Sequence, residues 1–297
     1  TAFDTVTKAI KWQYLTGGIM YSTPTIKNGI VYINCDDNFL YAVNALTGTL
    51  VWRYQQDTPS SGGGNYSSPT VVDDVVYFGS LDGYVYAVNA VSGVLKWRTL
   101  NTAGSRYHSS PSVVNNVLYI GDLSSNLIAL NTNNGSLKWI YNSLNGHAVS
   151  SPTIVDGVVY ICSYGGSVYA IDANSGTLQW RYNTGLDIDA SPIVLNGVLY
   201  IGAGSGGTST YFYAIHTNNG TLKWSNRTDQ GYFSSAVVFD NTVYVGTWPE
   251  VLAFNINTGL LKWKFTPLSN SEQFWPSPCI VDQQGNVYLS SISGSKD

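Results

Sequence analysis

The sequence predicts an all-β fold, a seven-bladed β-propeller of four-stranded antiparallel blades. Three observations support this interpretation. Each period holds four short apolar runs bounded by turn residues, no long amphipathic helix is evident, and the period stays near forty residues throughout. A repeat of this length with four strands is typical of a propeller. The period is marked by tryptophans at spacings of 39 to 45 residues, namely Trp12, Trp52, Trp97, Trp139, Trp180, Trp224 and Trp263.

The second full repeat shows the four strands most clearly. We expect strands at 67–72, 75–79, 84–88 and 94–98, because β-branched and aromatic residues dominate these runs. Asn89 then closes the third strand with an Asx-type turn, and Gly93 tolerates positive φ four residues later. The first copy has Asp4 followed by Lys8 where other copies have glycine. We therefore expect an altered turn in that copy.

The recurrent tryptophan begins the fourth strand of each repeat and is expected to be structural. A four-stranded sheet cannot bury both faces alone, so each blade must pack against its neighbours. A large flat side chain repeated once per blade can dock across that seam. We therefore assign all seven tryptophans to structural docking and not to ligand binding.

The two ends of the chain complete each other in this scheme. Residues 276–297 supply the first two strands of a repeat, and residues 1–12 supply the last two. We expect one propeller domain, 1–297, whose seventh blade combines both segments. The N-terminal strands would close the last blade and pair sheet edges that are otherwise open.

Composition excludes several classes of function. A net charge of -4 and a pI near 5.2 offer no cationic surface for a phosphate backbone, so we expect no nucleic-acid partner. No apolar run approaches the ~20 residues of a transmembrane helix. Cys35, Cys162 and Cys279 are odd in number and lack a CxxC spacing, so they predict neither a disulfide framework nor a zinc site.

The polar composition of the chain indicates the compartment in which the protein resides. Charged residues are only 11% of the chain, asparagine is abundant, and four Asn-x-Ser/Thr sequences begin at Asn65, Asn134, Asn219 and Asn226. This pattern favours an extracytoplasmic protein, whether secreted, periplasmic or on the cell surface. Because residue 1 already lies inside a repeat, we expect a monomeric domain of a larger chain.

The repeat Ala-x-(Asp/Asn)-x-x-(Thr/Ser/Asn)-Gly-x-(Leu/Val)-x-Trp, preceded by Ser-Pro and Gly-x-(Val/Leu)-Tyr, resembles the pyrroloquinoline quinone (PQQ)-type repeat of quinoprotein propellers. In that family it is known as the tryptophan-docking motif, and the resemblance covers essentially the whole chain. It implies the propeller fold. The family includes dehydrogenases and also propellers without a cofactor, such as the lipoprotein of the outer-membrane assembly machine and sensor domains of bacterial kinases. The best-known members have eight blades, whereas this chain counts seven.

The resemblance does not extend to the residues that quinoprotein dehydrogenases use to hold their cofactor and calcium. Quinoprotein alcohol dehydrogenases hold the quinone between a tryptophan and a disulfide of adjacent cysteines, and chelate calcium with Glu, Asn and Asp beside a catalytic Asp. Here no two cysteines are adjacent, and Glu250 and Glu272 are the only glutamates. We expect no PQQ cofactor and assign no catalytic residue. A PQQ-dependent dehydrogenase-like enzyme, or another propeller enzyme such as a lyase or hydrolase, stays the alternative.

The candidate ligand-binding site is the set of residues that precede the first strand of each repeat. First strands line the central channel of a propeller, so these residues should gather at one mouth with the neighbouring loops. Exposed aromatic rings can stack on a sugar or hold a peptide, and the alternative is that they plug the channel. Trp248 is singled out because no repeat requires it. The predicted mouth residues are Tyr21, Tyr66, Tyr107, His108, Asp187, Asp189, Tyr232, Phe233, Trp248, Phe274 and Trp275.

The densest candidate cluster for metal binding is Asp36, Asp37 and Asn38, and Asp187 with Asp189 is the next. Calcium takes six to eight oxygen ligands, which neither cluster supplies alone, so a turn role is favoured. His108 and His147 lack a third zinc ligand. The sequence thus predicts a non-catalytic recognition or scaffold module that contacts a protein, peptide or glycan at the mouth.

Overall fold

The described residues of the computed structural model form β-strands and turns, with no helix among them. They comprise residues 1–4, 7, 9–57, 65–101, 105–204, 210–228, 233–247, 250–266, 280–281 and 287–288. The chain divides into two compact units, Thr1–Asn142 and Ser143–Asp297. That the whole chain forms a single domain, as the sequence predicts, stays a prediction.

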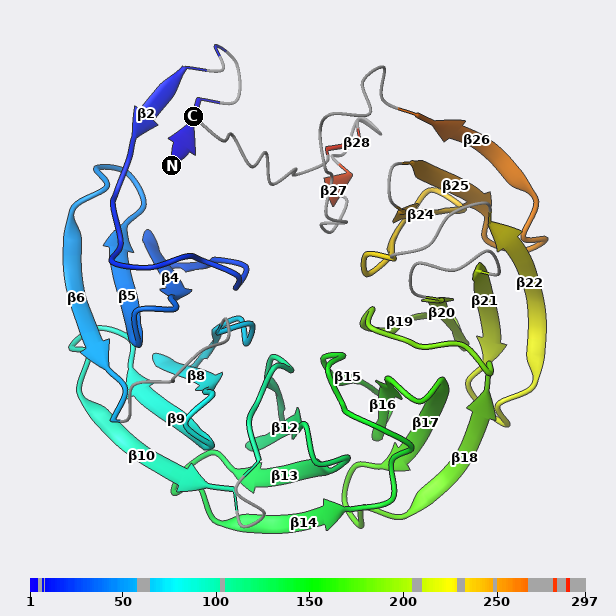
Figure 1. Cartoon of the computed structure of the whole chain (residues 1–297), viewed down its shortest axis with the longest axis horizontal. Coiled ribbons are helices and arrows are strands. Elements are labelled where there is room, and N and C mark those ends of the chain that lie inside the picture. The colour runs from blue at the N-terminus through cyan, green and yellow to red at the C-terminus, as the bar shows by residue number, and fades with distance from the viewer. Residues whose placement is uncertain are drawn as a thin grey trace. The chain divides into compact units, whose positions relative to one another are not determined.

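The first unit contains three complete blades and one strand pair (Figure 1). The pair is β1 (Ala2–Phe3) with β2 (Ile10–Trp12). Blade one is β3 (Thr25–Lys27), β4 (Ile30–Asn34), β5 (Phe39–Asn44) and β6 (Leu50–Gln55); blade two is β7 (Thr70–Val72), β8 (Val75–Gly79), β9 (Tyr84–Asn89) and β10 (Leu95–Leu100); blade three is β11 (Ser112–Val114), β12 (Val117–Gly121), β13 (Leu127–Asn131) and β14 (Leu137–Tyr141).

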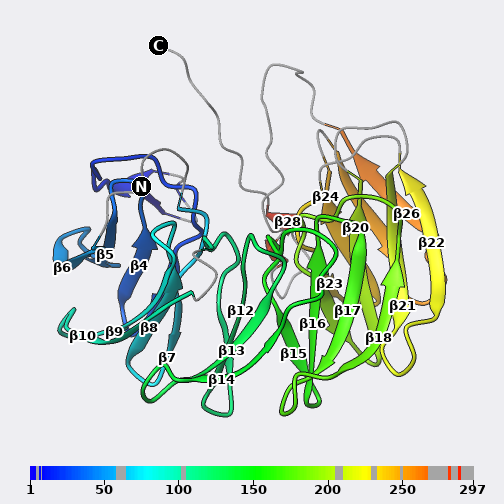
Figure 2. The same cartoon turned by 60° about the horizontal axis from the view of Figure 1, so that its bottom comes forward.

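The second unit repeats the same construction (Figure 2). Blade four is β15 (Thr153–Val155), β16 (Val158–Ser163), β17 (Ser167–Asp172) and β18 (Leu178–Asn183); blade five is β19 (Ile193–Leu195), β20 (Val198–Ala203), β21 (Thr210–His216) and β22 (Leu222–Thr228); blade six is β23 (Val237–Phe239), β24 (Thr242–Gly246), β25 (Val251–Asn255) and β26 (Leu261–Phe265). A pair, β27 (Ile280–Val281) and β28 (Val287–Tyr288), follows.

All neighbouring strands are antiparallel and follow chain order within their blade, so the fold is the predicted seven-bladed β-propeller. The pairs β1–β2 and β27–β28 are the two halves assigned to the seventh blade, and their joining stays a prediction. The first strands are shorter than expected. In blade two the sequence predicts a strand from residue 67, whereas β7 begins at Thr70, since Pro69 has no N–H to donate.

Tryptophans link neighbouring blades inside each unit. The Trp52 Nε1 donates to the carbonyl of Ala90 in the next blade at 2.9 Å, and the Trp97 Nε1 donates to Thr132 at 2.7 Å. In the second unit Trp180 donates to Thr217 at 2.7 Å. In all six complete blades, the centroid of the tryptophan ring also lies 5.7 to 5.9 Å from the centroid of a tyrosine ring in the second strand of the same blade. Trp263, in the middle of β26, remains 40% exposed.

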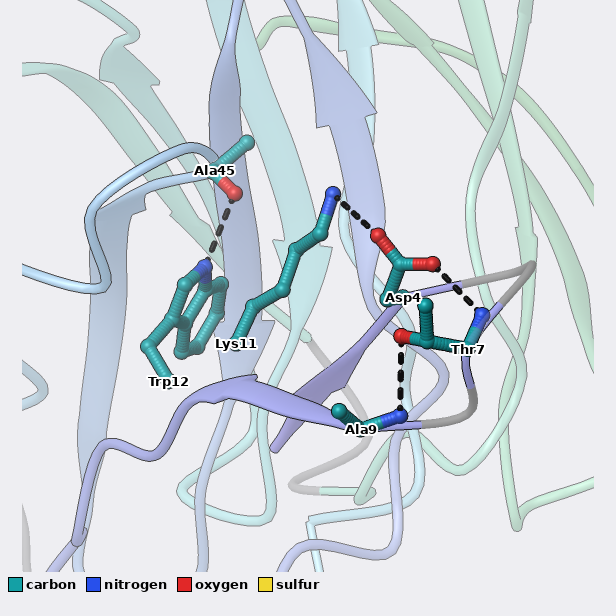
Figure 3. Close-up of polar contacts among 6 residues, drawn as sticks. All are labelled: Asp4, Thr7, Ala9, Lys11, Trp12 and Ala45. Carbon is teal, nitrogen blue, oxygen red and sulfur yellow. Dashed lines mark hydrogen bonds and ion pairs between the residues drawn. The ribbon is translucent and has the colours of Figure 1, made fainter.

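Figure 3 shows the N-terminal hairpin that carries Trp12. The Trp12 Nε1 donates to the carbonyl of Ala45 at 2.9 Å, as the other tryptophans do in their seams. The Thr7 amide donates to Asp4 Oδ1 at 2.8 Å, and Lys11 pairs with Asp4 at 3.2 Å. The divergent copy therefore keeps the Asx-type contact of the repeat. Lys8, on which the altered turn was predicted, lies outside the described residues.

Candidate functional site

In every complete blade except blade five, where Ala190 takes the position, a serine fixes the start of the first strand. In the first unit, Ser67 Oγ accepts a hydrogen bond from the Gly79 amide at 2.9 Å, which ties the start of β7 to the end of β8. Ser22 and Ser109 do the same for the amides of residues 34 and 121. The residue before each serine therefore occupies an equivalent position on successive blades. We call the strand ends where these serines lie the mouth end of a unit.

A second serine joins neighbouring blades at the mouth end. The Thr23 amide donates to Ser68 Oγ at 2.8 Å, and the Ser68 amide donates to Ser110 Oγ at 2.9 Å. The second unit has the same relay through Ser191 and Ser235. The Ser-Ser-Pro sequence is thus a structural element that sets the spacing between first strands.

Three rings held this way form a continuous row on the first unit. The centroid of Tyr66 lies 4.8 Å from that of Tyr21 and 4.6 Å from that of His108. Tyr21 is 42% exposed and Tyr66 is 43% exposed, while His108 is half-buried. Tilted contacts at these distances are favourable between aromatic rings. We call Tyr21, Tyr66 and His108 the aromatic row.

An acidic side chain borders the aromatic row. Burial, followed by the influence of Tyr21 and of the half-buried carboxylate of Asp36, raises the pKa of Tyr66. The Asn65 amide donates to Asp36 Oδ1 at 3.1 Å, and the Asn65 Nδ2 donates to the Cys35 carbonyl at 2.9 Å. These bonds hold Asp36 beside Tyr66. The row therefore combines exposed ring faces with one negative charge, which sequence reasoning about the row did not include.

Two predicted mouth residues are directed into the protein instead. Tyr107 is only 2% exposed, and its hydroxyl contacts the Asn101 side chain. It fits because Gly79 leaves space, since a Cβ at that glycine would lie 2.5 Å from the Tyr107 Cβ. Phe233 is likewise buried, over Gly202 and 6.2 Å from the ring of Phe212.

These two rings pack in seams between blades and offer no face to a ligand. The sequence signal for this arrangement is the glycine at the end of the second strand, which permits a large side chain from the next blade to enter. We leave Tyr107 and Phe233 out of the proposed binding surface.

The predicted acidic residues lie at the mouth end of the second unit. Asp187 is half-buried and its carbonyl accepts from the Gly204 amide at 2.8 Å. Asp189 retains contact with solvent, yet burial and the neighbouring Asp187 raise the pKa of its carboxyl group. The other predicted mouth residues, Tyr232, Trp248, Phe274 and Trp275, lie outside the described residues.

At the candidate metal cluster, the Asp37 carboxylate accepts hydrogen bonds from its own turn and from a distant segment of the chain. Asp37 Oδ2 accepts from the Gly17 amide at 2.8 Å and from the Tyr41 hydroxyl at 2.5 Å, and its Oδ1 accepts from the Phe39 amide. Asn38 has φ of 67° in the same turn. In the described part of the chain, no group of three or more His, Cys, Asp or Glu side chains is placed to hold a metal ion.

The cysteines do not fit a quinone-capping disulfide. Cys35 and Cys162 are free and completely buried, and burial raises the pKa of both thiols. They belong to different units, and Cys279 lies outside the described residues. The described side chains thus do not fit a calcium-bound PQQ. The described residues also include no helix long and apolar enough to cross a membrane.

Solved structures with a similar fold include a BamB protein and two dehydrogenases. BamB from Moraxella catarrhalis is 19% identical over 96% of this chain and 84% of that chain, with a TM-score of 0.79. A europium-containing methanol dehydrogenase is 14% identical over 98% and 78%, also with a TM-score of 0.79. A quinohemoprotein alcohol dehydrogenase from Pseudomonas putida HK5 is 16% identical over 92% and 62%, with a TM-score of 0.71. At these identities the likeness concerns the fold alone.

Family membership comes from the sequence. No curated protein matches the chain. A family model described as outer membrane protein assembly factor BamB matches residues 1–110, 81–186 and 185–265. Because these matches together span most of the sequence, the chain belongs to the PQQ-type repeat family of outer membrane protein assembly factor BamB.

Proposed function

We propose that the protein is a non-catalytic, extracytoplasmic binding module that holds a protein segment at the aromatic row. The observation that carries this proposal is the contact between Tyr21, Tyr66 and His108 on three successive blades. Two of these rings keep more than two fifths of their surface exposed, although buried positions exist one residue away. A fold that only needed to fill space would bury them, as it buries Tyr107.

The chemistry of the row favours a peptide with aromatic or arginine side chains. Ring faces provide a large contact area at a small cost in side-chain entropy, and they also attract a guanidinium group. Asp36, held beside Tyr66, supplies the negative charge that such a group pairs with. An extended segment crossing three blades would place successive side chains against successive rings.

Family membership supports a protein partner and an extracytoplasmic location. The matching family is described as an outer membrane protein assembly factor, and the similar Moraxella catarrhalis protein bears the same name. The dehydrogenases of similar fold are the alternative. We favour binding over oxidation because the described cysteines and carboxylates do not fit the quinone and calcium that such chemistry requires. In this proposal the seven recurrent tryptophans serve as structural residues.

The test uses the purified chain to select binders from a random peptide library and to probe a glycan array. Affinities of the selected peptides are then measured for the wild type, for Tyr66→Ala and for Tyr164→Ala. Tyr164 is a matched control because it is 42% exposed but lies outside the row. We expect Tyr66→Ala to weaken binding about 30-fold, as for a hot-spot aromatic residue worth ~2 kcal/mol, and Tyr164→Ala to change it little.

Other outcomes would redirect or overturn the proposal. Selected peptides that bind Tyr66→Ala as tightly as the wild type would remove the row from the site, and Trp248→Ala would then test the remaining predicted mouth residue. Binding of glycans without peptides would replace the ligand class. Stoichiometric PQQ binding with calcium-dependent, dye-linked alcohol oxidation would contradict the non-catalytic role.

A further inference from the structure

We propose that the folded protein is N-glycosylated at Asn134 and Asn219 and at neither of its other two Asn-x-Ser/Thr sequences. This inference rests on the extracytoplasmic location in the proposed function, because oligosaccharide transfer to asparagine takes place outside the cytosol. The four sequences begin at Asn65, Asn134, Asn219 and Asn226. Sequence alone treats them as equivalent, whereas the structure separates them into two pairs.

The first pair lies in exposed turns between the third and fourth strands of a blade. Asn134 stands in the turn between β13 and β14, and Asn219 in the turn between β21 and β22; both side chains are exposed. The hydroxyl residues two positions later, Ser136 and Thr221, are exposed as well. An acceptor sequence must offer both of these side chains to the transferase, and these turns do.

The middle residue of each sequence explains this display. Gly135 has φ of +73° and Gly220 has φ of +70°, and a Cβ on either would lie within 2.8 Å of a tryptophan ring of the preceding blade. Only glycine fits this left-handed conformation under an indole without strain. The glycine therefore faces inward, and the residues on both sides of it face solvent.

Hydrogen bonds leave the acceptor nitrogens available. Asn134 Oδ1 accepts from the Ser136 amide at 3.0 Å, and Asn219 Oδ1 accepts from the Thr221 amide at 3.1 Å and from its hydroxyl at 2.8 Å. Among the described residues neither Asn134 Nδ2 nor Asn219 Nδ2 has a hydrogen-bond partner. The amide nitrogen, which is the reactive atom, is thus the free end of each side chain.

In the second pair, the side-chain nitrogen of each asparagine donates a hydrogen bond that holds the fold together. Asn65 is 1% exposed, and its Nδ2 donates to the Cys35 carbonyl at 2.9 Å. Asn226 is half-buried, and its Nδ2 donates to the Gly259 carbonyl of the next blade at 2.6 Å. In the folded protein a transferase reaches neither nitrogen without breaking a contact between blades.

The turn itself does not require asparagine. The same position holds Thr47, Ser92, Ser175 or Thr258 in other blades, and each hydroxyl accepts from the amide two residues later at 3.3 to 3.4 Å. The position of the third residue tolerates an apolar side chain, since Val94 and Leu260 occupy it in blades two and six. The fold therefore does not require an asparagine at position 134 or 219. The serine and threonine residues of the other blades show which replacements keep the turn.

The modification is a group transfer from a polyprenyl phosphate-linked oligosaccharide. The asparagine nitrogen attacks C1 of the first sugar, so a nitrogen–carbon bond forms and the bond from C1 to the phosphate oxygen breaks. The lipid phosphate leaves with the electron pair, and one amide proton passes to a base of the transferase. Both turns lie at the strand ends opposite the mouth end of their units, so the glycans would leave the aromatic row accessible.

The experiment maps glycopeptides by mass spectrometry in two samples. One is the protein purified from the cells that naturally produce it, and the other is folded, unmodified protein treated with an oligosaccharyltransferase and a lipid-linked oligosaccharide. We expect glycan at Asn134 and Asn219 only. Asn134→Ser and Asn219→Thr keep the turn acceptor and should each remove one glycan, and Asn226→Ser should remove none.

A positive control is available in blade four. Ser175→Asn completes an Asn-Gly-Thr sequence in the equivalent turn before β18 and should add a third glycan in the treated sample. Modification at that position without modification at Asn134 and Asn219 would overturn the proposal, as would glycan on Asn65 or Asn226 of the folded protein. Sites modified in the treated sample but bare in the native one would overturn the proposed modification, while peptide binding by the aromatic row keeps its own test.

Discussion

The two ends of each blade differ in how strongly the fold determines their residues. At the end where the third strand turns into the fourth, a glycine with positive φ lies under the tryptophan of the preceding blade, as Gly93 lies under Trp52. At the mouth end, equivalent positions hold Tyr66, His108 or Phe233, some exposed and some buried. Residues that recur from repeat to repeat therefore serve packing between blades, whereas residues that differ between repeats are free to serve binding.

The largest test of this distinction replaces one aromatic residue at each location. Trp97 is 8% exposed and donates to the Thr132 carbonyl of the next blade. Trp97→Ala removes a buried ring and leaves that carbonyl without this donor, so we expect a loss of about 3–5 kcal/mol in the free energy of unfolding. Tyr66→Ala should cost less than about 1.5 kcal/mol because its ring is partly exposed. Urea unfolding measures both, and equal losses would break the distinction.

A second test isolates the glycine beneath the indole. Gly93 has φ of +72°, and a Cβ there would lie 2.8 Å from the Trp52 ring. Gly29 has φ of +74° with no atom within 4 Å of the same position. Gly93→Ala should lower the free energy of unfolding by about 2–4 kcal/mol, from backbone strain and overpacking together. Gly29→Ala carries the backbone strain alone and should cost about 1–2 kcal/mol. Matching losses in thermal or urea unfolding would show that the indole contact is unimportant.

The repeat made the fold predictable because local and tertiary requirements coincide in it. Turn chemistry at Asn89 and Gly93 also satisfies packing against Trp52, so one pattern reports both. The strand starts were less predictable. Ser67 and Pro69 look like part of a strand. The Ser67 hydroxyl instead accepts from the Gly79 amide, and the Ser68 hydroxyl accepts from the Thr23 amide of the neighbouring blade, so these contacts replace ladder hydrogen bonds.

The candidate site was predictable only in part, since position in the repeat does not fix side-chain direction. Tyr66 and Phe233 occupy equivalent positions, yet Gly202 makes room for Phe233 to turn inward. The placement of Asp36 beside Tyr66 depends on hydrogen bonds from Asn65 that cross between blades. Such contacts join residues of different blades, so the sequence of a single repeat does not predict their geometry.

The smallest expected effect compares a carboxylate at the mouth end of blade five with a carboxylate in the opposite turn of blade four. Burial and Asp187 raise the pKa of Asp189 at the mouth end of the second unit. Hydrogen bonds from the Ser175 amide and hydroxyl lower the pKa of Asp172 in the turn after β17. A raised folded-state pKa means that the folded protein binds the proton more tightly than the unfolded chain does. Stability therefore falls as the pH rises from the unfolded pKa of Asp189 through its folded value, and the penalty persists at neutral pH.

Asp172 has the opposite sign, because its lowered pKa contributes stability above the unfolded pKa that is lost as the pH falls through the folded value. We expect Asp189→Asn to raise the melting temperature at pH 7 by an amount equivalent to less than about 1 kcal/mol, since the side chain keeps contact with water. Asp172→Asn should lower it slightly at pH 7, although asparagine, which occupies this position as Asn89 in blade two, preserves the turn acceptor. Both differences should shrink when melting is repeated near pH 3. A destabilising Asp189→Asn at pH 7 would instead make that carboxylate part of the scaffold, and the mouth end of the second unit would then resemble the turn end.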